Sequence, residues 1–132
     1  MDTFAPFSLN FLKLLDKSYK MYYAVNMKLI GIEWDDDKNE KNKRDHEGLG
    51  FEDAQHVFAD PERLERLDRS EKNTSGEERW QTLGMVGKVL FVVYTERGKN
   101  KRIISARIAE KHERRSYNGY YNIDGKGWAK AT

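Results

Sequence analysis

Apolar, often β-branched residues are concentrated in three stretches in the second half of the chain, which is typical of β-strands. Short connections that contain glycine join these stretches. We therefore predict a run of consecutive strands that are paired with their neighbours, over Glu78–Val86, Lys88–Glu96 and Arg102–Ile108. Gly84 and Gly87 are expected to flank the first connection, and the turn Gly98–Lys101 to form the second.

The first half of the chain has a different pattern of helix signals and short apolar runs. Lys28–Trp34 is predicted as a strand, and Asp35–Asp37 then supply a cap and first-turn acids for a helix that runs to about Asp45. Phe51–Ala59 is predicted as a second helix, which the Asp-Pro pair after it ends. Arg63–Asp68 is at best a short strand.

The ends of the chain differ from this middle part. Glu110–Tyr117 is polar and is predicted as a final helix. We expect a domain over 27–117, an N-terminal extension over 1–26 with one possible short helix, and a partly ordered tail over 118–132. The element order β-α-α-β-β-β-β-α predicts an α+β fold, in which an antiparallel meander carries the helices on one face.

The predicted strands carry an unusual number of arginines. Strand alternation places Arg97 on one face of its strand, together with Phe91 and Val93. It places Arg102 and Arg107 on opposite faces of the last strand, unless a bulge intervenes. Since an arginine within a sheet is costly to desolvate without an anion, these positions indicate a surface for a polyanion.

Charge is distributed unevenly along the sequence. Residues 28–78 hold nine Lys/Arg against sixteen Asp/Glu, which gives −7, whereas residues 79–132 hold twelve against four, which gives +8. This asymmetry indicates a basic functional face, and internal pairing of the two halves is the alternative. There is no cysteine, and no apolar run approaches the ~20 residues of a membrane span, so we expect a cytoplasmic protein without disulfides.

Five segments in a fixed order carry a family resemblance: IEWDDDKNEKN, GFEDAQHVFADP, EERWQTLG, VVYTERG and RIISARIAEKHERRSY. Together they resemble the BrnT family, the toxins of the BrnT/BrnA type II toxin–antitoxin systems of bacteria. The resemblance covers about residues 27–117 and implies a RelE-like fold and a ribonuclease activity that inhibits translation. It also implies neutralisation by a BrnA-like antitoxin with a ribbon-helix-helix domain, through which alone operator DNA would be bound.

Cleavage of RNA by its own 2′-hydroxyl needs a base, an acid and cations on the phosphate. We predict three acid or base candidates, and three arginines as the cations: His46, Glu78 and Glu113, with Arg79, Arg97 and Arg107. The alternative for His46 is a helix C-cap. The alternative for the arginines is pairing with nearby glutamates, and a Glu beside arginines would be a poor acid.

Further basic and aromatic residues are predicted to bind RNA or an acidic antitoxin segment: Arg102, Lys43, Arg114 and Tyr117. Tyr117 is also an acid or base candidate, and its alternative is packing of the last helix on the sheet. No cofactor is expected, nor a metal site, because the three histidines lie in separate elements. The alternative function is a non-catalytic module that binds RNA or antitoxin, because the segment around His46 departs from the order usual in the family.

Overall fold

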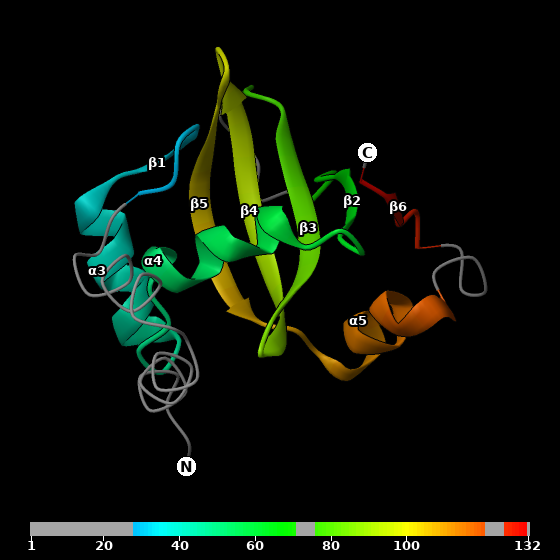
Figure 1. Cartoon of the computed structure of the whole chain (residues 1–132). Helices are drawn as coiled ribbons and strands as arrows, with labels where there is room; N and C mark the ends of the chain where they lie inside the picture. Colours follow the sequence, from blue (N-terminus) through cyan, green and yellow to red (C-terminus); the bar gives the residue numbers. More distant parts are fainter. Residues whose placement is uncertain (1–27, 71–75, 121–125, 132) are drawn as a thin grey trace.

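A six-stranded sheet forms the centre of the molecule, with the strands in the order β1-β5-β4-β3-β2-β6 (Figure 1). The computed structural model describes residues 28–70, 76–120 and 126–131, so the possible helix in 1–26 lies outside the described residues. The strands are β1 Ile32–Trp34, β2 Leu64–Leu67, β3 Arg79–Val86, β4 Lys88–Arg97, β5 Asn100–Ile108 and β6 Ala129–Lys130.

The helical segments precede and follow the central strands. They are α3 Asp36–Asp45, α4 Phe51–Ala54, the 3₁₀ helix η1 Gln55–Ala59, α5 Lys111–Arg115 and the single π turn η2 Ser116–Tyr120. Within the described residues, no helix is long and apolar enough to cross a membrane. The predicted single helix over residues 51–59 was wrong in its second half. The chain tightens into η1 where Val57 lies so close to Gly84 that a Cβ there would lie 2.7 Å from the Val57 Cβ. Gly84 lies inside β3, so it does not flank the turn between β3 and β4 as predicted.

Helix α3 begins where the capping residues predicted. The Asp35 side chain accepts a hydrogen bond from the Lys38 backbone N–H at 3.0 Å. Acidic residues occupy the first turn and basic residues the last, which matches the helix dipole at both ends. The sequence therefore determines the start and the end of this helix locally.

The antiparallel meander is confirmed for β2 to β5, and β1 adds a parallel pairing with β5 at the edge. The predicted strand Lys28–Trp34 is shorter than expected. Ile32 N–H donates to the Leu29 carbonyl at 3.1 Å and Gly31 has φ 82°, so a turn occupies its first half. The expected α+β class holds, with three helices beside the sheet.

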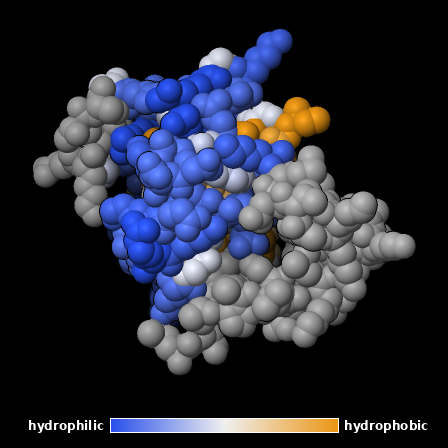
Figure 2. Space-filling view, turned by 90° about the vertical axis from the view of Figure 1, so that its left-hand side faces the viewer, coloured by the Kyte–Doolittle hydropathy of each residue, from blue (hydrophilic) through white to orange (hydrophobic). Residues whose placement is uncertain are grey.

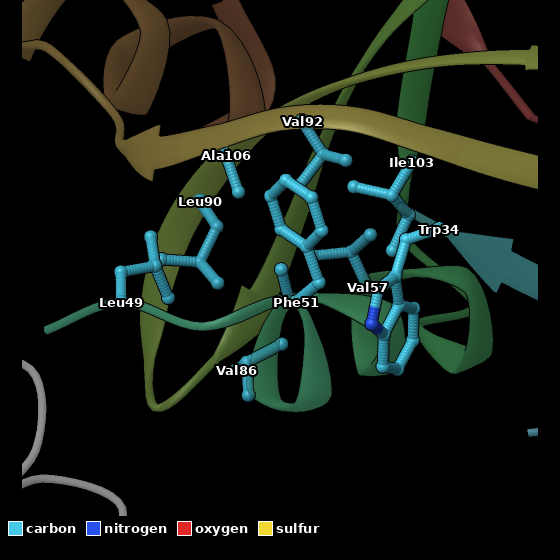
Figure 3. Packing of buried hydrophobic residues seen from close by; sticks show 10 residues of the cluster. Trp34, Leu49, Phe51, Val57, Val86, Leu90, Val92, Ile103 and Ala106 are labelled. Carbon is cyan, nitrogen blue, oxygen red and sulfur yellow. The ribbon is translucent and has the colours of Figure 1, made fainter. Parts of the chain in front are cut away.

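One face of the sheet packs against the segment from α3 to η1. Phe51 lies at the centre of this first cluster, fully buried, with its ring 6.2 Å from that of Trp34 in an edge-on contact (Figure 3). Leu90 and Val92 of β4 and Ile103 of β5 contribute the sheet side of the cluster. Most of the aliphatic burial on this face thus comes from the central strands.

The opposite face carries a second apolar cluster, so the prediction that all helices share one face was wrong. Phe91 and Val93 of β4 point to this side, where Tyr117 and Trp128 pack against the cluster or within it. The physical reason lies in β4, whose successive residues from Val89 to Thr95 are all buried. A strand that is apolar on both faces needs cover on both, and α5 with η2 supplies part of it.

The C-terminal segment belongs to the sheet and is not only a tail. β6 pairs antiparallel with β2, through Leu64 opposite Lys130 and Glu65 opposite Ala129. The Trp128 side chain beside it is only 4% exposed. This single buried tryptophan gives the segment an apolar anchor.

Helix α3 contains no apolar residue, and the described atoms on the side of the molecule where it lies are mostly hydrophilic (Figure 2). Its two buried side chains are Asn39 and Asn42. Asn39 accepts from the Phe51 N–H at 2.8 Å and thereby fixes the start of α4. Asn42 donates to the Ala106 carbonyl at 2.9 Å and accepts from the Ala106 N–H at 3.1 Å. Side-chain amides therefore hold α3 on the edge of β5.

We expect Asn42→Ala to lower the free energy of unfolding by about 2–4 kcal/mol, because it leaves the buried N–H and C=O of Ala106 without partners. Urea denaturation measures this loss. Asn42→Asp keeps the acceptor but sets a buried carboxylate oxygen against the Leu49 and Ala106 carbonyls, so it should lose at least as much. A loss below 1 kcal/mol for Asn42→Ala would contradict the assigned role.

The pKa of His56 in η1 is lowered from 6.5 to about 4 because burial disfavours the charged imidazolium. Between these values the unfolded chain binds a proton that the folded chain does not, so stability falls as the pH is lowered from 6.5 to 4. At 1.36 kcal/mol per pKa unit the upper bound of the effect is about 3.4 kcal/mol, which the partial exposure of the ring reduces. His56→Gln should flatten this part of the curve of unfolding free energy against pH. Parallel curves for the two proteins would contradict the expectation.

Candidate functional site

The second face of the sheet gathers the predicted arginines of three strands, β3, β4 and β5. Cross-strand neighbours share a face, and the register joins Arg79 to Thr95, Thr95 to Arg102, and Arg102 to Glu33 in one row. Arg97 lies on the same face in the next row, and Arg107 lies on that face two rows away on the other side, opposite Phe91. The predicted arginines therefore share one surface, although they come from different strands.

A bulge in β5 produces this arrangement. Val93 pairs with Ser105 and Tyr94 pairs with Ile103, which leaves Ile104 as an extra residue. The extra residue shifts the alternation of β5, so Arg102 and Arg107 face the same side. The prediction of opposite faces was wrong, because regular alternation does not hold across a bulge.

The end of α3 brings His46 to this face. Gly48 N–H donates to the Lys43 carbonyl at 2.8 Å, and Glu47 between the two takes φ 55°, as in a Schellman ending. His46 is the C-cap of α3, as the alternative interpretation expected, and its side chain also lines the cavity described next. The two roles are compatible, since the cap uses the backbone of His46.

A cavity of about 480 Å³ opens on the second face beside His46. Its floor is apolar, with Phe91, Val93 and Ile104. Its polar lining comes from α3, the end of β2, β3 and β5, and consists of His46, Asp68, Ser70, Arg79, Gln81, Ser105 and Arg107. The structure thus brings together three of the predicted catalytic residues: His46, Arg79 and Arg107.

Arg79 differs from the other arginines of this face. Its Nε is buried and has no hydrogen-bond partner in the part of the chain that the structure describes. By contrast, Arg97 pairs with Glu77 at 3.5 Å and Arg102 with Glu33 at 3.2 Å. A buried guanidinium nitrogen without a partner, at the wall of a cavity, is suited to an anionic ligand.

Arg107 is held in place by Glu113. Its two terminal nitrogens donate to the two carboxylate oxygens of Glu113 at 2.7 and 2.9 Å, and its guanidinium lies 4.0 Å from the ring centre of Phe91. Burial would raise the pKa of Glu113, but hydrogen bonds from Arg107 and the Glu110 backbone N–H outweigh it and lower the pKa overall. Glu113 is therefore a carboxylate that orients Arg107, and it is a poor proton donor.

The remaining predicted residues lie away from this cavity or are engaged elsewhere. Glu78 is exposed and does not line the cavity. Lys43 pairs with Glu40 and Glu52, and Arg114 donates to the Ala109 carbonyl at 2.8 Å.

Tyr117 packs beside the second cluster, as its alternative interpretation expected. Its hydroxyl donates to Asp60 at 2.5 Å. Burial and then the Asp60 carboxylate raise the pKa of Tyr117 well above its usual range. The hydroxyl therefore keeps its proton, and the ring is fixed between the last helix and the loop before β2.

Sequence reasoning missed four polar residues of the cavity: Asp68, Ser70, Gln81 and Ser105. Gln81 lies two residues after Arg79 on the same strand, so alternation alone could have placed it on the same face. Asp68 and Ser70 follow β2, and no local signal connects them with β5.

In the described part of the chain, no group of three or more His, Cys, Asp or Glu side chains could hold a metal ion. The cavity instead offers fixed cations, one imidazole and a carboxylate, Asp68, on its opposite wall. Such a set can bind a phosphate and move a proton.

Comparison with known proteins identifies the family. The model for the BrnT ribonuclease toxins of type II toxin–antitoxin systems matches residues 34–113. The chain belongs to the BrnT family. The matched region contains β2 to β5, the cavity and the Arg107–Glu113 pair. Membership makes the chain a ribonuclease toxin of a type II system and implies an antitoxin partner.

A solved structure is also similar to the chain. The crystal structure of the Brucella abortus ribonuclease toxin BrnT matches with 21% sequence identity and a TM-score of 0.43, over 61% of this chain and 96% of that one. No curated protein matches. The family model does not match residues 126–131, so β6 lies outside the matched region.

We expect Glu113→Gln to lower the free energy of unfolding by about 2 kcal/mol, because it leaves the partly buried Arg107 without its charged partner. A double-mutant cycle with Arg107→Met, measured by thermal or urea unfolding, isolates the pair. The two losses should not add. Full additivity would contradict the pairing.

Proposed function

We propose that this BrnT-family toxin cleaves RNA at the cavity on the second face, without a metal ion. The observation that carries the proposal is the unpartnered Nε of Arg79 in a cavity that His46 and Arg107 also line. In the reaction, the ribose 2′-oxygen attacks the adjacent phosphorus and the bond to the 5′-oxygen breaks. The products are a 2′,3′-cyclic phosphate and a free 5′-hydroxyl.

Each step has a candidate residue. Arg79 binds the non-bridging phosphate oxygens, whose charge grows in the transition state, and Arg107 supports it from a fixed position. His46 accepts the proton of the 2′-hydroxyl or donates one to the leaving 5′-oxygen, since imidazole exchanges protons readily near neutral pH. Glu113 acts only through Arg107, because both its oxygens are engaged there.

RNA cleavage by such a toxin would inhibit translation in the cytoplasm, and a cognate antitoxin with a ribbon-helix-helix domain would neutralise it. The basic surface of the second face would attract either partner, RNA or an acidic antitoxin segment. Operator DNA would then be bound through the antitoxin alone.

A specific observation favours the second candidate function, a non-catalytic module that binds RNA or antitoxin. Glu113 is held by Arg107, and Glu78 and Tyr117 lie outside the cavity, so among the predicted acid or base residues only His46 lines it. A cavity with a single proton-transfer group is compatible with binding alone as well as with catalysis. Cleavage assays distinguish the two functions.

We expect Arg79→Met and His46→Ala each to reduce the cleavage of single-stranded RNA by at least a hundredfold, since each removes a group that acts on the transition state. Lys88→Met is the control, because it removes one exposed positive charge from β4 outside this cavity. Cleavage is measured by gel electrophoresis of labelled RNA in the presence of EDTA.

His46→Ala should still bind RNA, with an affinity that falls steeply with salt. RNA binding by the wild type without cleavage would favour the non-catalytic module. Cleavage that needs an added divalent cation would contradict the metal-independent mechanism.

A further inference from the structure

A chain of side chains connects the wall of the cavity to β2. Arg66 Nε donates to Gln81 Oε1 at 2.7 Å, and Gln81 Nε2 donates to Asp68 Oδ1 at 3.1 Å. Arg66 lies opposite Gln81 in the register, and Gln81 lies opposite Val93 of the cavity floor. The Ser70 N–H also donates to Asp68 Oδ1, at 2.9 Å.

These contacts fix the direction of the Gln81 amide. Because a guanidinium only donates and a carboxylate accepts, the oxygen of Gln81 must face Arg66 and its nitrogen must face Asp68. Among the described residues, one N–H of Gln81 and Oδ2 of Asp68 then have no partner. A hydrogen-bond donor therefore stands beside an acceptor at the wall of the cavity.

Arg66 is itself held by the C-terminal segment. Its guanidinium lies 4.0 Å from the ring centre of Trp128, and its Nη1 donates to the Lys126 carbonyl at 2.6 Å. Trp128 is anchored in the second cluster, with its ring 6.4 Å from that of Phe91. This segment lies outside the region that the family model matches.

We propose that Asp68 and Gln81 recognise one nucleobase of the RNA, and that the C-terminal segment positions them through Arg66. The proposal rests on the proposed function, because it gives the substrate of the same cavity a base-binding subsite. The edge of a nucleobase presents a donor beside an acceptor, which the pair complements. The apolar floor formed by Val93 and Ile104 contacts the face of the base.

The spacing suits a nucleotide. Arg79 and Gln81 are two residues apart on β3, which separates them by about 7 Å. A phosphate at Arg79 would leave its base within reach of Gln81 and Asp68. The negative Asp68 favours a base edge that donates through an N–H, whereas Asn at this position can also donate.

The test is the sequence selectivity of cleavage. Single-stranded RNA of random sequence is cleaved by each variant, and the bases beside the cut are read by sequencing the fragment ends. Asp68→Asn and Gln81→Leu should change the ratio of rates between bases at one position by at least tenfold, and Glu96→Gln should not. Glu96 is the matched control, since it is an exposed carboxylate on β4 that pairs with Lys101.

Arg66 is a positioning residue. Its variants therefore need a measurement that does not change when only the stability of the fold changes. Arg66→Met should reduce the selectivity at the same position, and Arg66→Lys should restore it in part, at equal melting temperatures. Unchanged selectivity in all the variants, with cleavage intact, would overturn this inference and leave the proposed function standing.

Binding of the four nucleoside 3′-monophosphates, measured by calorimetry, tests the subsite without cleavage. The wild type should prefer one of them by at least fivefold, and Asp68→Asn should remove that preference. Equal affinities for all four in the wild type would overturn the inference. A base preference in a wild type that cleaves no RNA would support the subsite while the proposed catalysis fails.

Discussion

The amide of Asn42 takes the place of a strand at the free edge of β5. β1 pairs with β5 only from Lys101 to Ile103, so the N–H and C=O of Ala106 lie beyond its end. Asn42 satisfies both groups and also donates to the Leu49 carbonyl at 3.0 Å. Unpaired backbone groups at a buried edge are costly, so this amide fixes where α3 crosses the sheet. The position of His46, four residues later, depends on that crossing.

The bulge at Ile104 is the second constraint on the cavity. It turns Ile103 and Ala106 toward the first cluster and Arg102 and Arg107 toward the second face. Without the extra residue, one of these arginines would lie under α3 and α4, where the cluster is apolar. The bulge therefore reconciles an apolar core on one side with a cationic surface on the other.

The sequence predicted local features and missed the long-range ones. The cap of α3 and the strands β3 to β5 depend on neighbouring residues and were predicted, although β5 starts at Asn100, inside the predicted turn Gly98–Lys101. The bulge depends on the register with β4, and the role of Asn42 depends on an edge 64 residues away. The C-terminal strand was missed because two paired residues and one buried Trp128 leave no periodic pattern. Of the cavity, the sequence predicted His46, Arg79 and Arg107, whereas Asp68 and Ser70 reach it only through the long-range pairing of β2 with β3.

The arginines of the second face differ more in their hydrogen-bond and ion-pair partners than in their positions. Arg97, Arg102 and Arg107 each pair with a carboxylate, so much of their charge is already compensated within the fold. Arg107 gains a fixed direction from this pairing, since a bidentate contact on one side and an aromatic ring on the other restrict it. Arg79 keeps a buried Nε without a partner among the described residues. Under the proposed function, an anion bound beside Arg79 would offset the charge of this buried guanidinium, and the paired arginines would surround it.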